Sequence, residues 1–202
     1  MAAGLLALGA GCGSNASGEA EGNGALKASL TGAGATFPYP LYSKWFDVFN
    51  KENPGVSINY QSIGSGGGIK QIIAKTVDFG ASDAPMKDKE LDAAPAELIH
   101  IPTVAGAVAI VYNVNDLDTG LKLTSETLAR IFLGEITRWD DPALAADNPG
   151  VNLPDEDIAV VHRSDGSGTT NIFTDYLSTA NADWKTEVGK GKAVDWPVGI
   201  GG

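Results

Sequence analysis

Residues 29–51 read SLTGAGATFPYPLYSKWFDVFNK and contain the unit on which the predicted fold is built. A short strand is expected over Ser29–Gly32, followed by a glycine-rich turn and by a helix over Pro40–Lys51. Apolar side chains recur on one face of this helix, at Leu41, Trp45, Val48 and Phe49. A strand that enters a helix through a tight turn is typical of a mixed α/β fold.

The residues that follow repeat this alternation of strand and helix. The pattern predicts strands at Val56–Ser62 and Phe79–Ser82, and helices at Gly67–Lys75 and Asp88–Ala94. This order favours a largely parallel sheet, because each helix can return the chain to start the next strand in the same direction.

The chain is then expected to cross to a second lobe. Apolar strands are predicted at Ile99–Thr103 and Ala107–Tyr112, and Gly106 between them is the expected crossing point. The later predicted elements are a helix capped by Thr124 and stopped at Gly134, a buried strand at Ile158–His162, and a helix at Thr169–Ala180.

Composition limits the possible ligands. The 202 residues are 43% hydrophobic and 19% charged, which is enough apolar content for one large core or two small ones. The net charge of -11, without a cluster of Lys and Arg, argues against nucleic-acid binding. An anion site in so acidic a chain must be local and enclosed, because binding of a small anion is set within a few ångströms.

The first 25 residues read as a leader and tether that precede the fold. The apolar run Leu5–Gly11 ends in small residues directly before Cys12, the only cysteine, and Gly13–Gly24 has no periodicity. This pattern resembles the end of a bacterial lipoprotein signal followed by a flexible tether. Cys12 is therefore the predicted lipidation site, with a chance cysteine in a leader as the alternative.

Three glycine-rich turns carry the candidate chemistry, and each opens a helix. They are Thr31–Phe37, Ser62–Gly68 and Arg163–Thr169. Glycines allow close backbone approach to a ligand, and free amides at a helix N-terminus favour negative charge. One such turn is more often only a helix cap, but three, one of them beside an arginine, favour an oxyanion site.

Motifs for phosphate chemistry or metal catalysis are missing from the sequence. The pairs Gly189-Lys190 and Gly191-Lys192 lack the flanking residues of a nucleotide-binding loop. His100 and His162 lack metal-ligand spacing, and Ser167 does not stand in a nucleophile elbow. The chain is therefore not expected to be an enzyme or to hold a metal or cofactor.

Several runs resemble the phosphate-binding proteins of bacterial phosphate ABC transporters, in order from about Ser29 to the last residue. They are Leu30–Pro38, Gly64–Ile73, Val77–Pro85, Trp139–Asp141, Arg163–Thr169 and Trp196–Gly199. The resemblance implies a two-lobed periplasmic-binding-protein fold of type II, which closes on its ligand like a Venus flytrap. It divides the chain into a leader and tether (1–25), a first lobe (26–104) and a second lobe (105–202).

The resemblance also assigns a phosphate site. It places Thr36, Phe37 through its backbone amide, Ser65 and Asp83 in the first lobe, and Arg163, Ser167, Gly168 and Thr169 in the second. Asp165 is the residue expected to orient Arg163. Phosphate keeps a proton near neutral pH, so Asp83 can accept a hydrogen bond from it and would repel sulfate. On residue type alone, the better interpretation of Asp83 is that it ends a strand and caps a turn, and Arg163 could form a surface ion pair with Asp165.

The implied function is capture of inorganic phosphate outside the cytoplasmic membrane and delivery to the permease of an ABC transporter, with membrane attachment only through a lipid anchor. Family members return to the first lobe with their C-terminal segment, whereas this sequence stops at Gly202 within the second lobe. We therefore expect an incomplete first-lobe sheet and poor folding of the 202 residues alone. A phosphate sensor or surface protein on the same fold remains an alternative. A phosphoester hydrolase is disfavoured, because the sequence offers neither an activated nucleophile nor a metal cluster.

Overall fold

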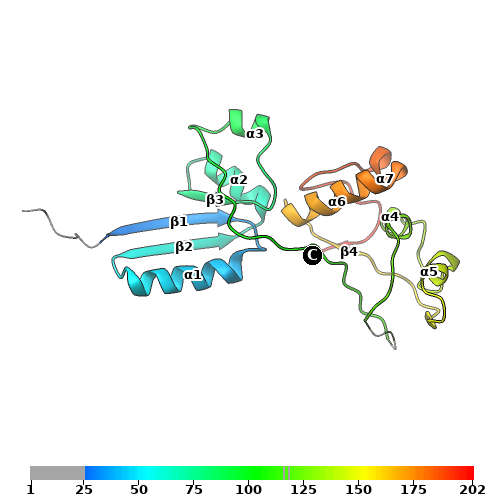
Figure 1. The fold of residues 1–202 in the computed structure, drawn as a ribbon. Coiled ribbons are helices and arrows are strands. Elements are labelled where there is room, and N and C mark those ends of the chain that lie inside the picture. Colours follow the sequence, from blue (N-terminus) through cyan, green and yellow to red (C-terminus); the bar gives the residue numbers. More distant parts are fainter. Residues whose placement is uncertain (1–25, 116, 118) are drawn as a thin grey trace, which may run out of the picture.

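The computed structural model describes residues 26–115, 117 and 119–202, so Cys12 and the tether predicted for residues 1–25 lie outside the described residues. Figure 1 shows β1 to α3 on one side and α4 to α7 with β4 on the other. We name these groups the first lobe (residues 28–92) and the second lobe (residues 125–201). The described elements are β1 (Ala28–Gly34), α1 (Tyr39–Glu52), β2 (Val56–Ser62), α2 (Ser65–Ile73), β3 (Phe79–Ala81), α3 (Asp88–Asp92), α4 (Ser125–Leu133), α5 (Pro142–Asp147), β4 (Val161–His162), α6 (Gly168–Ala180), α7 (Ala182–Glu187) and β5 (Ile200–Gly201).

The first lobe is a three-stranded sheet of order β2-β1-β3 with parallel pairing, as predicted. Helix α2 packs against β1 and β3, and α1 packs against β2. Gly68 allows α2 to approach the sheet closely, because a Cβ there would lie 2.5 Å from the Cα of Gly34. The predicted apolar face of α1 is less buried than its pattern suggested: Trp45, Val48 and Phe49 are exposed, and Tyr42 is the buried residue.

The second lobe is organised by side-chain packing. One cluster joins α4, α6 and α7 through Leu128, Phe173, Leu177 and Trp184, with Trp196 packed against it. A second cluster, around Ile136 and Leu144, lies toward α5. Helix α4 begins after the Thr124 cap and ends at Gly134 in the left-handed conformation, as predicted.

The segment that joins the lobes contradicts the sequence prediction. Residues 97–114 contain neither helix nor strand, so the strands expected at Ile99–Thr103 and Ala107–Tyr112 are wrong. A strand requires a partner for its backbone groups, and β3 pairs only with β1 within the described chain. The apolar side chains therefore stay in solvent, with Ile99 82% and Val111 88% exposed. The predicted boundary at 104/105 falls within this segment and stays a prediction.

The buried strand expected at Ile158–His162 is also shorter and more open than predicted. Only Val161–His162 forms β4, which pairs in parallel with β5, and Val161 is exposed. Helices α5 and α7 were not predicted, although Asp141 and Asn181 cap them as short polar residues do. None of the helices in the described ranges is long and apolar enough to cross a membrane.

Candidate functional site

Two candidate ligands lie in the turn between β1 and α1. Gly34 adopts φ +142 beside the Ala81 carbonyl, where a side chain would collide with the β3 backbone. The chain then continues through Thr36 and Phe37, both exposed, into α1. Among the described residues, the Phe37 amide donates to no acceptor. This amide is therefore available to an anion.

The second turn ends in the N-terminus of α2. Gly64 precedes the helix at φ +78, and α2 has no side-chain cap. Ser65 is fully buried, and its hydroxyl accepts a hydrogen bond from the Asp83 amide at 3.2 Å. The Ser65 amide has no acceptor among the described residues. An uncapped helix N-terminus retains its positive dipole end and favours negative charge.

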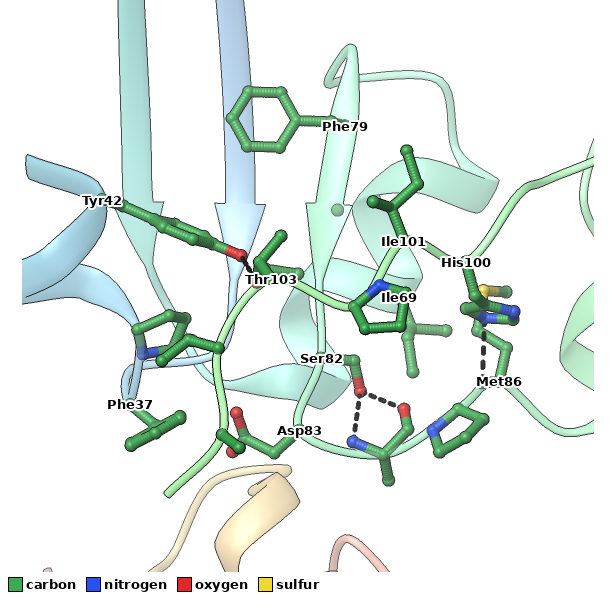
Figure 2. Close-up of a pocket in the computed structure, with 18 of the residues that line it drawn as sticks. Phe37, Tyr42, Ile69, Phe79, Ser82, Asp83, Met86, His100, Ile101 and Thr103 are labelled. Carbon is green, nitrogen blue, oxygen red and sulfur yellow. Dashed lines mark hydrogen bonds between the residues drawn. The ribbon is translucent and has the colours of Figure 1, made fainter. Parts of the chain in front are cut away.

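Asp83 follows β3 and faces both lobes. Burial raises the pKa of its carboxyl group, while the hydrogen bond from Ser65 and the charge of Arg163 act in the opposite direction. Figure 2 shows Asp83 and Phe37 at the same end of a cavity of about 820 Å³. Among the candidate ligands, Phe37, Asp83 and Thr169 line this cavity, and residues 97–109, most of them apolar, form a large part of the remaining wall.

Arg163 is held in place from the second lobe. Its guanidinium donates to both carboxylate oxygens of Asp165, from Nε at 2.7 Å and from Nη2 at 2.5 Å. This is the ion pair that the sequence suggested, and it fixes the plane of the guanidinium while leaving one terminal nitrogen for a further acceptor. The Asp165 carboxylate also lies against Gly64, so the pair touches the first lobe.

The third turn opens α6, and Ser167 caps it. Its hydroxyl accepts a hydrogen bond from the Thr170 amide at 3.2 Å, and the Ser167 side chain is almost fully buried. Within the described chain, the amides of Gly168 and Thr169 have no acceptor. Helix α6 therefore presents two free amide donors at its positive end. Helix α2 likewise presents the free amide of Ser65.

The two lobes meet where these donors lie. The Gly66 amide donates to the Gly166 carbonyl at 2.6 Å across the lobes. A Cβ on Gly168 would lie 2.5 Å from the Ser65 hydroxyl oxygen and 2.6 Å from the Asp83 Oδ2. The structure thus brings Ser65 and Asp83 of the first lobe to the N-terminus of α6, which lies far from both in the sequence.

Sequence reasoning missed the backbone contact that joins the lobes. It chose side chains for chemistry, whereas Gly66 and Gly166 interact through main-chain atoms alone. The signal was present in the glycine content of both turns. Among the described residues, no group of three His, Cys, Asp or Glu side chains is placed to hold a metal ion.

Comparison with known proteins places this arrangement in a family. The profile of the PBP superfamily domain matches residues 17–197. The chain is 55% identical over 175 residues to the phosphate-binding protein PstS of Pasteurella multocida, covering 86% of this chain and 50% of that protein. The PstS protein of Haemophilus influenzae is also 55% identical over 175 residues, covering 86% of this chain and 52% of that protein. The chain thus spans about half the length of these curated relatives.

A solved structure supports the fold. It is a putative phosphate ABC transporter substrate-binding protein with bound phosphate from Clostridium perfringens, with a TM-score of 0.57 and 24% identity. The match covers 78% of this chain and 58% of that one. At this identity the similarity concerns the fold alone.

Proposed function

This chain belongs to the PBP superfamily, and from that membership we propose that it binds inorganic phosphate between its two lobes and delivers it unchanged to an ABC transporter permease. The observation that carries the proposal is the meeting, across the lobes, of two helix N-termini that keep free amides, one arginine and one half-buried carboxyl group. The names of the curated relatives support the choice of phosphate.

The proposed ligands divide by chemistry. Arg163 supplies a permanent positive charge and a planar fork for phosphate oxygens, held by Asp165. The other donors are amides and hydroxyl groups, provided by Thr36, Phe37, Ser65, Ser167, Gly168 and Thr169. Amide donors at two helix ends stabilise an anion without adding net charge to the cleft. This explains how so acidic a chain could bind phosphate.

Asp83 would supply selectivity. A carboxylate beside the anion is unfavourable unless the ligand brings a proton to share, and phosphate does so near neutral pH. Sulfate carries no proton there and offers only acceptors. Burial raises the pKa of Asp83 because its charged form is poorly solvated in the cleft, and a second unprotonated anion beside it would be unfavourable.

The cellular setting of the proposal follows from the leader. Lipidation of Cys12 would hold the protein at the outer face of the membrane, and the Gly13–Gly24 tether would let the lobes reach a permease. The first lobe would then extend over residues 26–104 and the second over 105–202, with residues 97–114 as the crossing.

Calorimetric titration tests the function directly. We expect the complete protein to bind phosphate and to ignore sulfate at the same pH and ionic strength. Asp83→Asn should weaken phosphate binding less than it relaxes the rejection of sulfate, because the amide can donate to a sulfate oxygen. Absence of phosphate binding by the complete protein would refute the function, and an Asp83→Asn variant that loses phosphate yet still ignores sulfate would refute the role of Asp83.

A further inference from the structure

One ion pair joins the lobes through two side chains that are not among the proposed ligands. The Lys192 ammonium lies 3.2 Å from both carboxylate oxygens of Glu90. Glu90 lies on α3 in the first lobe, and Lys192 lies after α7 in the second. The pair therefore exists only while the two lobes are together.

This pair is more enclosed than the lysine pairs that stay within one lobe. The side chain of Lys192 is 12% exposed and that of Glu90 is 28% exposed. Lys190, two residues earlier, pairs with Asp175 inside the second lobe and is 60% exposed. Exposed pairs contribute little because water screens them, so Lys192 and Glu90 have the stronger interaction per pair.

Both partners are fixed by further bonds. The carbonyl group of Lys192 accepts a hydrogen bond from the Ser167 amide at 2.8 Å, which connects it to the cap of α6. The Glu90 carboxylate accepts from the Lys87 amide at 2.8 Å and so caps α3. Burial alone would raise the pKa of Glu90, but the hydrogen bonds from Lys87 and Lys192 and their charges outweigh it, and the net pKa is lowered.

We propose that Lys192 and Glu90 form a latch that sets the balance between open and closed lobes, and hence the phosphate affinity, without touching the ligand. The effect on affinity depends on the proposed function, whereas the effect on lobe separation does not. When the lobes part, both charges are exposed to water and the attraction is lost, so removing the pair lowers the fraction of chains competent to enclose ligand.

The test uses substitutions that remove the charge and keep the surrounding contacts. Lys192→Met keeps the buried stem, and Glu90→Gln keeps an acceptor for the Lys87 amide. Lys192→Arg should preserve the pair. The matched control is Lys190→Met, which removes the same charge from an ion pair within the second lobe.

Two measurements separate the latch from the proposed function. The first is the rate of phosphate release by stopped flow, which we expect to rise roughly 3- to 30-fold in Lys192→Met and Glu90→Gln. The second is the distance between spin labels at Lys44→Cys and Lys185→Cys, on opposite lobes and both exposed, in a Cys12→Ser background without phosphate. The single variants should shift this distribution toward longer distances, and the double variant should add little to either one.

The outcomes are distinct. Lys192→Arg and Lys190→Met should both behave like the parent chain in the label distances. If the parent chain binds no phosphate, the proposed function fails, but longer distances in the single variants still support the latch. If the label distances of Lys192→Met and Glu90→Gln match those of the parent, the latch is refuted, whatever the affinity for phosphate. The same holds if Lys190→Met gives equal shifts.

Discussion

In the first lobe three strands share a continuous backbone ladder, whereas the second lobe has only a two-residue strand pair but buries Trp184, Leu177 and Leu144 completely. The first lobe combines this ladder with an aromatic cluster around Tyr42, Tyr60 and Phe79, whereas the helices of the second lobe are joined by side-chain packing. The candidate ligands reflect this, because those of the first lobe lie after strands, while those of the second lie between the short strand β4 and the first turn of α6.

The helix starts differ in the same way. In the second lobe α4, α5, α6 and α7 all have a side-chain cap, from Thr124, Asp141, Ser167 and Asn181. In the first lobe, α1 and α2 have none. The lobe that lacks a large sheet thus fixes its helices individually, while α1 and α2 depend on the sheet that they pack against.

The largest predicted effect tests whether the second lobe depends more on a buried side chain than the first lobe does. Trp184→Ala should lower the free energy of unfolding of the second lobe by about 3 to 5 kcal/mol, because it removes a large, fully buried side chain. Trp45→Ala on α1, where the side chain is 44% exposed, should change it by about 1 kcal/mol or less. Urea unfolding followed by circular dichroism measures both. Equal losses would show that the two lobes depend on packing alike.

The next prediction compares two arginines of the second lobe, of which only Arg163 is proposed to contact the ligand. Arg163→Met should weaken phosphate binding by about 2 to 5 kcal/mol, because it leaves the anion without its cation. Arg130→Met is the control, since Arg130 pairs with Glu135 elsewhere in the same lobe. Isothermal titration gives both affinities. A loss below about tenfold for Arg163→Met would mean that the free amides carry the site.

The smallest predicted effect concerns the caps. Thr124→Ala removes the acceptor for the Thr127 amide and should destabilise the second lobe by about 1 kcal/mol. Thr186→Ala, within α7, should be nearly neutral, because Thr186 bonds only to a carbonyl of its own helix. Urea midpoints compare the two variants. A neutral Thr124→Ala would show that packing, and not capping, fixes the start of α4.

Helices, strands and helix ends could be predicted from the sequence where neighbouring residues determine them. Periodicity and turn residues placed the strands and helices of the first lobe, and Thr124 and Gly134 gave both ends of α4. The two strands wrongly predicted within residues 99–112 contain the apolar residues typical of strands. A strand also needs a partner for its backbone groups, and such a partner is distant in the sequence. Pattern alone cannot supply that partner.

The candidate site shows the same division. The glycine-rich turns, the Arg163 pair and Asp83 could be singled out from residue type and resemblance. The bond between Gly66 and Gly166 and the pair between Glu90 and Lys192 could not, because each joins residues about a hundred positions apart. The roles of the assigned ligands remain predictions that the titrations address.

The contact between Gly66 and Gly166 also bears on how easily the lobes can separate. Neither residue has rotamers to restrict, and Gly66 is already ordered by the first turn of α2. Bringing the lobes together at this point therefore freezes no side chain, unlike closure over a seam of long, flexible residues. A joint of this kind can be made and broken with no loss of side-chain freedom, as the proposed cycle of phosphate capture and release would require.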